Sequence, residues 1–125
     1  MAIVLDHTIV PAHDKEASAR FFAEMFGLAY EGGKGHFAPV RVNDALTFDF
    51  DNREGFENHH YAFHITDEEF DAILGRVKAA GRTYGSGPMT PTDGKINTRR
   101  GGRGFYFADL DGHLLEVMTT PESGT

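Results

Sequence analysis

Apolar and polar positions follow a pattern that the chain shows twice. Residues 3–11, IVLDHTIVP, are rich in β-branched side chains and predict a strand that ends at a proline. Asp14 then caps a predicted helix that runs to about Phe26, with Gly27 as its stop. The apolar residues of this helix recur at helical spacing and are Ala17, Phe21, Phe22, Met25 and Phe26. Three short strand-like runs follow, LAYEG, HFAPVRV and ALTFDF.

The pattern restarts after residues 51–58, DNREGFEN, a polar stretch that we interpret as a linker. HHYAFHI predicts a new strand, and Thr66 with Glu69 forms a capping box for a second helix that runs up to Gly81. One face of that helix consists of Phe70, Ile73, Leu74 and Val77. RTYGSGPM, GFYFADL and HLLEVMT are again strand-like, and an Asp-Gly pair predicts a hairpin turn between the last two.

Matched spacings indicate that the two halves are an internal repeat. His7 precedes Asp14 by seven residues, and His60 precedes Asp67 by seven. The helix-ending glycine follows 20 residues after His7 and 21 residues after His60. We therefore predict an α+β fold of two tandem βαβββ modules, at about 1–50 and 59–120, within a single domain of residues 1–125.

Composition narrows the classes of function. The chain is 40% hydrophobic with eleven Phe, which is typical of a globular protein. No apolar run approaches the roughly 20 residues that span a bilayer, and the N-terminus lacks the features of a signal peptide. We therefore expect a cytoplasmic protein without a membrane partner. The net charge of −7 argues against nucleic acid, and the absence of cysteine leaves histidine and carboxylate as the metal ligands.

Three histidines lie close together in ENHHYAFHIT, at the start of the second half. Because side chains alternate along a strand, His60 and His64 share one face with the small Ala62. That face suits the wall of a cavity. His59 lies on the other face with Tyr61 and larger apolar residues, which suit packing beneath a helix.

Glu116 is an acidic residue inside the apolar run HLLEVM. Burial of a carboxylate is costly without a partner. The alternative to a buried, partnered Glu116 is therefore a Glu116 on an exposed strand face. His7 is the repeat equivalent of His60. The alternative to a metal ligand at this position is a neutral, hydrogen-bonded histidine. Together, His7, His60 and Glu116 fit a facial triad that leaves coordination positions free for substrate or oxygen.

Three segments, LDHTIV, HHYAFHI and FYFADLDGHLLEV, resemble the vicinal oxygen chelate superfamily. That superfamily includes glyoxalase I, extradiol dioxygenases, fosfomycin-resistance thiol transferases and bleomycin-resistance proteins. The last segment is the most specific, because Tyr106 to Glu116 follows the family pattern of Tyr, two residues, Asp-Pro-Asp-Gly, three residues and Glu, with Leu110 in place of Pro. The resemblance implies modules that curl into a barrel-like cup, a homodimer and a small-molecule substrate.

The resemblance also implies roles for particular residues. His7, His60 and Glu116 would bind one divalent metal ion, for which Fe(II), Mn(II), Ni(II) and Zn(II) all suit the ligands. Tyr106 would be a catalytic residue beside the substrate, and its alternative is a structural aromatic between two phenylalanines. His64 would face the substrate. His113, beside the hairpin turn, is expected to be solvated.

A basic cluster lies in KINTRRGGRG, directly before the Tyr106 strand. It consists of Lys95, Arg99, Arg100 and Arg103. Arginine binds carboxylate or phosphate through two hydrogen bonds, so these residues are candidates for contact with an anionic substrate. Their alternative is a solvated loop, which the three neighbouring glycines favour.

Several chemistries of the superfamily stay open. Glyoxalase I takes a fourth ligand from the last strand of the first module, where residues 45–48 offer none and Asp49 is expected to be out of register. Dioxygenases use a further histidine upstream of Tyr106, a role for which His64 or His36 would have to substitute. Bleomycin-binding relatives lack the metal ligands. We predict a metal-dependent enzyme, an extradiol-type dioxygenase first, with a glyoxalase-like lyase, a thiol transferase or a drug-binding protein as alternatives.

Overall fold

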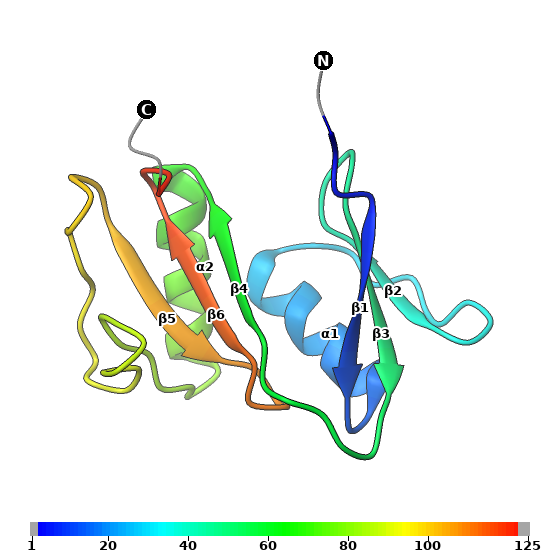
Figure 1. Cartoon of the computed structure of the whole chain (residues 1–125). Coiled ribbons are helices and arrows are strands. Elements are labelled where there is room, and N and C mark those ends of the chain that lie inside the picture. The colour runs from blue at the N-terminus through cyan, green and yellow to red at the C-terminus, as the bar shows by residue number, and fades with distance from the viewer. Residues whose placement is uncertain (1–2, 123–125) are drawn as a thin grey trace. The chain divides into compact units, whose positions relative to one another are not determined.

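The chain has an α+β fold, and the computed structural model describes residues 3–122. It divides into an N-terminal module, residues 1–57, and a C-terminal module, residues 58–125, each of which is described by itself. The N-terminal module contains β1 (His7–Ala12), α1 (Lys15–Phe26), β2 (Ala38–Arg41) and β3 (Thr47–Asn52) (Figure 1). The C-terminal module contains β4 (His60–His64), α2 (Asp67–Ala79), β5 (Gly104–Ala108) and β6 (Leu114–Met118).

Both modules have the same sheet topology, as the predicted repeat requires. The strand orders are β1-β3-β2 and β4-β6-β5. In each sheet the first strand pairs in parallel with the last strand, and the last strand pairs antiparallel with the strand before it. A parallel pair needs a crossover connection, and in each module the helix forms part of it. The curling of the sheets into a cup stays a prediction.

The predicted helix ends are confirmed. Asp14 accepts a hydrogen bond from the Ala17 N–H at 3.2 Å, and Gly27 ends α1 in the left-handed region with a φ of 71°. Thr66 and Glu69 form both hydrogen bonds of the capping box at the start of α2. The two helices have 12 and 13 residues, and within residues 3–122 no helix is long and apolar enough to cross a membrane.

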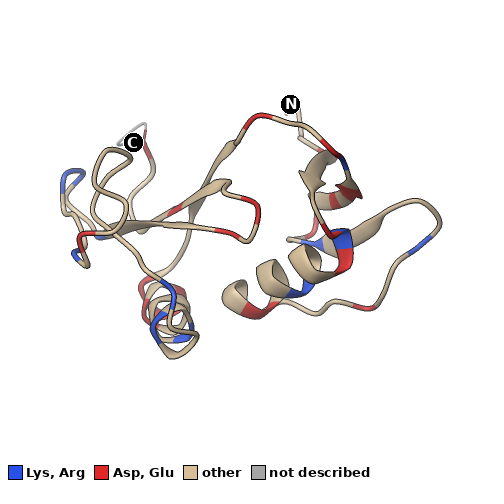
Figure 2. Ribbon diagram, turned by 90° about the horizontal axis from the view of Figure 1, so that it is seen from below, with Lys and Arg blue, Asp and Glu red and all other residues tan. Residues whose placement is uncertain are grey.

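Each helix packs its apolar face on one face of its own sheet, so the core of each module is aromatic. In the N-terminal module, the Phe22 ring lies 5.1 Å from Phe48 and 5.9 Å from Phe50. In the C-terminal module, Phe70 of α2 meets Phe105 of β5 edge to face at 5.3 Å. Figure 2 shows α2 on one side of the sheet. The opposite face of this sheet is therefore not covered by α2.

Two of the six strand-like runs after the helices are not regular strands. Residues 28–32 form no strand, and residues 82–89 contribute only isolated bridges, from Gly85 to Tyr106 and from Gly87 to Thr90. Glycine and proline interrupt residues 82–89 and weaken strand pairing there, and Gly32 ends the first segment. At Gly85 a side chain would also clash, because a Cβ there would lie 2.0 Å from the Thr90 carbonyl oxygen. The segment that follows, up to Arg103, forms turns beside β5.

Candidate metal centre and substrate site

The face of the β4-β6-β5 sheet opposite α2 carries the predicted site residues of the C-terminal module. Glu116 pairs with Ala62 on one side and with Tyr106 on the other, so these three side chains share a face. His60 lies on the same face, two residues before Ala62. Glu116 and Tyr106 are each 3% exposed, whereas His60 is half-exposed. The sheet register therefore brings a histidine, a carboxylate and a tyrosine together.

Glu116 is the centre of this group. His60 Nε2 donates to Glu116 Oε1 at 3.0 Å, and Arg100 Nη1 donates to Glu116 Oε2 at 3.3 Å. Tyr106 lies directly opposite Glu116 in the sheet register. A buried carboxylate needs such partners. The alternative position of Glu116, on an exposed strand face, is thereby excluded.

Tyr106 is held by the loop before it. Arg99 Nη1 donates to the Tyr106 hydroxyl at 3.1 Å, and its guanidinium lies 5.7 Å from the centre of the ring. Arg99 Nη2 in turn donates to the Ser86 carbonyl at 2.6 Å. Burial raises the pKa of Tyr106, and the hydrogen bond to Glu116 adds to the rise while Arg99 opposes it. The hydroxyl is therefore protonated at neutral pH and able to donate a hydrogen bond.

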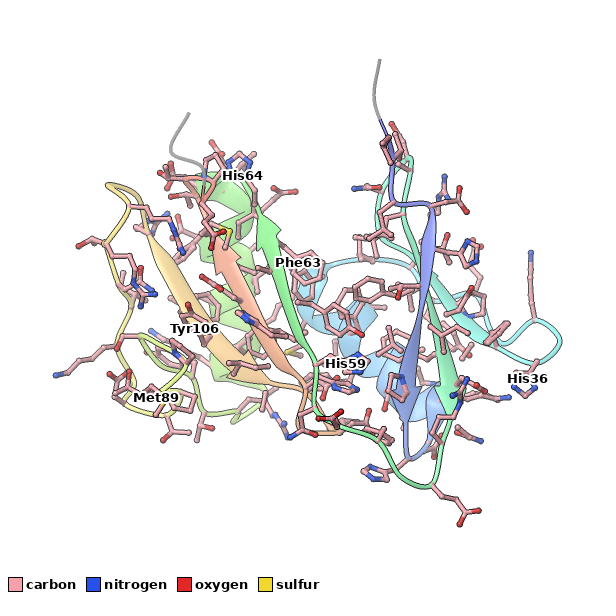
Figure 3. All side chains as sticks on the ribbon, viewed as in Figure 1. His36, His59, Phe63, His64, Met89 and Tyr106 are labelled. Carbon is pink, nitrogen blue, oxygen red and sulfur yellow. The ribbon has the colours of Figure 1, made fainter. Side chains whose placement is uncertain are left out.

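Two predicted substrate contacts and Arg103 do not join this group. His64 lies at the C-terminal end of β4, exposed, and donates to the Thr119 carbonyl at 3.2 Å (Figure 3). Lys95 is exposed, and its backbone N–H donates to Asp93. Arg103 forms ion pairs of 2.9 Å with Asp67 and 2.8 Å with Asp71. Of the basic cluster, Arg99 and Arg100 reach Tyr106 and Glu116, and Arg103 fastens the loop to α2.

His7 lies in the N-terminal module, exposed on β1. Its Nδ1 is 2.9 Å from Asp6 Oδ2. This hydrogen bond raises the pKa of His7, and the charges of Asp6 and Asp49 add to the rise. His7 and His60 belong to different modules, and each module is described by itself. The role of His7 as a metal ligand therefore stays a prediction.

Asp49 occupies the position that Glu116 occupies in the other module. His7 pairs with Thr47, two residues before Asp49, and His60 pairs with Leu114, two residues before Glu116. We expected the fourth-ligand position of glyoxalase I to fall at residues 45–48, with Asp49 out of register. That expectation was wrong, because Asp49 is the residue in register with Glu116. The signal was present in the sequence, because ALTFDF and HLLEVM each carry one acidic residue inside an apolar run.

A second polar group lies at the hairpin turn between β5 and β6. Three residues of this group, Asp109, Asp111 and His113, are all buried. One potential ligand atom from each lies within 4.8 Å of the others, so among the described residues this group could hold a metal ion. The expectation that His113 is solvated was wrong, because its side chain is completely buried. Burial also raises the pKa of Asp109.

Hydrogen bonds of the turn explain much of this burial. Asp109 Oδ1 accepts from the backbone N–H groups of Asp111 at 2.8 Å and His113 at 2.9 Å. His113 Nδ1 accepts from the His59 backbone N–H at 2.9 Å, so one ring nitrogen is already used. We interpret this group as the fastening of the hairpin turn to the start of β4.

A family model described as the Glyoxalase/Bleomycin resistance protein/Dioxygenase superfamily matches residues 4–117. The chain belongs to this superfamily. The match covers both modules, including His7, the β4 histidines and Glu116. The resemblance seen in the sequence motifs is thereby confirmed.

Members of the superfamily with different names are similar to this chain. Oxidase ChaP-H2 is 44% identical, with a TM-score of 0.93 and 100% of both chains covered. Oxidase ChaP-H1 is 45% identical, with a TM-score of 0.90, 96% of this chain and 98% of that chain covered. Glutathione transferase FosA of Serratia marcescens is 26% identical over 120 residues, which are 90% of this chain and 78% of that protein.

Proposed function

We propose that this chain is a divalent-metal-dependent enzyme that uses oxygen to oxidise a small, oxygen-bearing substrate, in the manner of an oxidase or extradiol-type dioxygenase. The observation that carries the proposal is the pairing of His60 and Glu116 beside Tyr106 on the sheet face opposite α2. The similarity of 44% and 45% to two proteins named oxidases, over nearly their whole lengths, favours oxygen chemistry within the superfamily.

The donor atoms on this face fit a metal ion. Two ligands that bind one ion at about 2.1 Å and at a right angle lie about 3 Å apart. His60 Nε2 and Glu116 Oε1 are 3.0 Å apart. We propose His7, the repeat equivalent of His60, as the third ligand. An imidazole and carboxylate set of this kind suits Fe(II), Mn(II), Ni(II) and Zn(II), and oxygen chemistry favours the first two.

The bound ion would act as a Lewis acid for substrate oxygen atoms. Tyr106 would donate a hydrogen bond to one of those oxygens and orient the substrate, because its hydroxyl is protonated and held by Arg99. Arg99 and Arg100 would stabilise negative charge on the substrate. Lys95 and His64, both exposed, would contact only the outer parts of a larger substrate.

Two other functions have an observation in their favour. Asp49 stands where a fourth protein ligand would come from in a glyoxalase-like lyase. The similarity to glutathione transferase FosA, although 26%, favours a thiol transferase. A drug-binding protein without metal is the remaining alternative, and the filled positions of His60 and Glu116 argue against it.

The first test measures metal content and turnover together. Protein purified without an affinity tag is reconstituted with Fe(II), Mn(II), Ni(II) or Zn(II) separately. Catechols are then screened with an oxygen electrode, and methylglyoxal–glutathione and fosfomycin–thiol pairs by product detection. We expect oxygen uptake with Fe(II) or Mn(II) only.

Variants connect the activity with the proposed ligands. His60→Ala and Glu116→Gln should lose the metal, because each removes a donor from the face. His59→Ala is the matched control and should keep it, because His59 precedes β4 and its ring contacts Tyr61 edge to face and lies beside His113. Equal metal content in all three variants would refute the assignment. Turnover of methylglyoxal–glutathione with Ni(II) or Zn(II) would show that the chain is a glyoxalase-like lyase and would refute the proposed oxidase function.

A further inference from the structure

We propose that Arg100 is the counter-ion of Glu116 in the metal-free protein and competes with the metal ion for that carboxylate. The proposal rests on the proposed metal site and concerns how that site is regulated. It predicts that metal binds more tightly when Arg100 loses its charge. A residue that merely supported the site would have the opposite effect.

The contacts of Arg100 place it between two carboxylates. Its Nη1 lies 3.3 Å from Glu116 Oε2, and its Nη2 lies 3.5 Å from Glu122 Oε1. The Glu116 side chain is 4% exposed and that of Glu122 is 88% exposed. Arg100 is thus shared between a buried acceptor on the site face and a solvated acceptor near the C-terminus.

Charge explains why this sharing matters. The ionised Glu116 carboxylate is buried, and burial of a single charge without a partner is strongly unfavourable. In the metal-free protein, Arg100 supplies a full positive charge 3.3 Å from Glu116 Oε2. A divalent ion beside Glu116 supplies that charge itself and repels the guanidinium. Arg100 contacts Oε2 and His60 contacts Oε1, so the ion and the guanidinium would share one carboxylate. Their repulsion therefore disfavours the Arg100 contact once metal binds, and Glu122 offers another one.

The movement that this requires is confined to one side chain. The backbone is closely packed two residues after Arg100, because a Cβ at Gly102 would lie 2.3 Å from Thr120 Oγ1. Arg103 N donates to Thr119 Oγ1 at 2.8 Å, and the Arg103 side chain is paired with α2. The loop backbone can therefore stay in place while the Arg100 side chain changes its partner.

The release of Arg100 also links the metal to the substrate. An anionic group of the substrate would be a new partner for the guanidinium once the ion has displaced it from Glu116. Because coupling between two ligands is reciprocal, such a substrate would in turn tighten metal binding. Arg100 would thus favour an anionic substrate only at a site that already holds its metal.

The test measures Zn(II) affinity by competition with a chromogenic chelator, and the thermal stability of the metal-free protein, without any activity assay. Arg100→Met should lower the Zn(II) dissociation constant by roughly ten-fold or more, which corresponds to only about 1.4 kcal/mol. It should also lower the melting temperature of the metal-free protein, because Glu116 loses its counter-ion. Arg100→Gln is a second neutral variant in case the first does not fold. Arg100→Lys keeps the charge and should stay near the wild-type affinity.

Lys95→Met is the matched control, since it removes the same charge from an exposed position of the same loop. It should leave the Zn(II) affinity within about two-fold, as expected for a solvated, screened charge. Weaker or unchanged Zn(II) binding in both neutral Arg100 variants would overturn the competition. A wild-type protein that binds neither Zn(II) nor Mn(II) would overturn the metal site itself, a result distinct from unchanged binding in the variants.

Discussion

At the scale of single residues, the environment of Tyr106 decides what its hydroxyl can do. The hydroxyl accepts a hydrogen bond from Arg99, and burial raises its pKa. A tyrosine in these surroundings donates a hydrogen bond and does not act as a phenolate near neutral pH. Its ring lies 5.9 Å from that of His60, so the two side chains border the same part of the sheet face.

Tyr106→Phe removes this donor and keeps the ring. We expect kcat for the substrate found by the oxygen screen to fall roughly ten- to hundred-fold, the usual range for loss of one oriented donor. Metal content should stay unchanged. Tyr84→Phe is the control, because its ring packs against Phe105, which lies on the α2 side of the sheet. Equal kcat in Tyr106→Phe and wild type would leave Tyr106 as a structural aromatic.

Residue types alone predicted the partners of Glu116 only in part. The cost of burying a carboxylate in HLLEVM indicated that Glu116 needs a partner, and the repeat indicated His60. Which cations of the basic cluster reach the site depends on how the loop turns, and no local pattern in KINTRRGGRG separates Arg100 from Arg103. His113 was misjudged because a polar residue beside a turn is usually solvated, whereas here its burial follows from the contact with His59.

At the scale of elements, the segment between α2 and β5 shapes the site. Its backbone is joined to β5 by the bridge of Gly85 with Tyr106, in which Gly85 N donates at 2.9 Å and Gly85 O accepts at 2.8 Å. The next residue, Ser86, supplies the carbonyl that holds Arg99. The helices were predictable because their caps and apolar faces are local. This segment was predicted as a strand, and its turns depend on close backbone contacts that a sequence pattern does not report.

Two glycine substitutions test the role of this segment. Gly85→Ala forces a Cβ to within 2.0 Å of the Thr90 carbonyl and should reduce the free energy of unfolding by about 1–3 kcal/mol. The displaced Ser86 should also weaken substrate binding through Arg99. Gly75→Ala is the matched control in the exposed middle of α2, where a Cβ meets nothing within 4 Å. It should stabilise by about 0.5–1 kcal/mol. Urea denaturation measures both, and equal midpoints for Gly85→Ala and wild type would contradict the close contact.

At the scale of the whole molecule, duplication of one module explains why Asp49 and Glu116 occupy equivalent positions in the two sheets. The repeat places a histidine at the start of the first strand and a carboxylate on the last strand of each module, His7 with Asp49 and His60 with Glu116. The two carboxylates differ in length by one methylene, which is about 1.5 Å of reach. Substitutions at Asp49 therefore distinguish the proposed three-ligand set from a set with a fourth protein ligand.

Asp49→Glu adds one methylene and makes this position identical to that of Glu116. We expect it to bind Zn(II) and Fe(II) roughly ten-fold more tightly, because a fourth protein ligand is added, and to lower oxygen uptake, because the open position is filled. Asp49→Asn should leave the metal affinity within about three-fold of wild type, since the shorter residue is not a ligand. Chelator competition and the oxygen electrode measure the two effects, with Asp44→Glu in an exposed loop as the control for added length. Loss of metal in Asp49→Asn, as severe as in His60→Ala, would show that Asp49 is itself a ligand. In that case the four-ligand set of a glyoxalase-like lyase would become the better account of this chain.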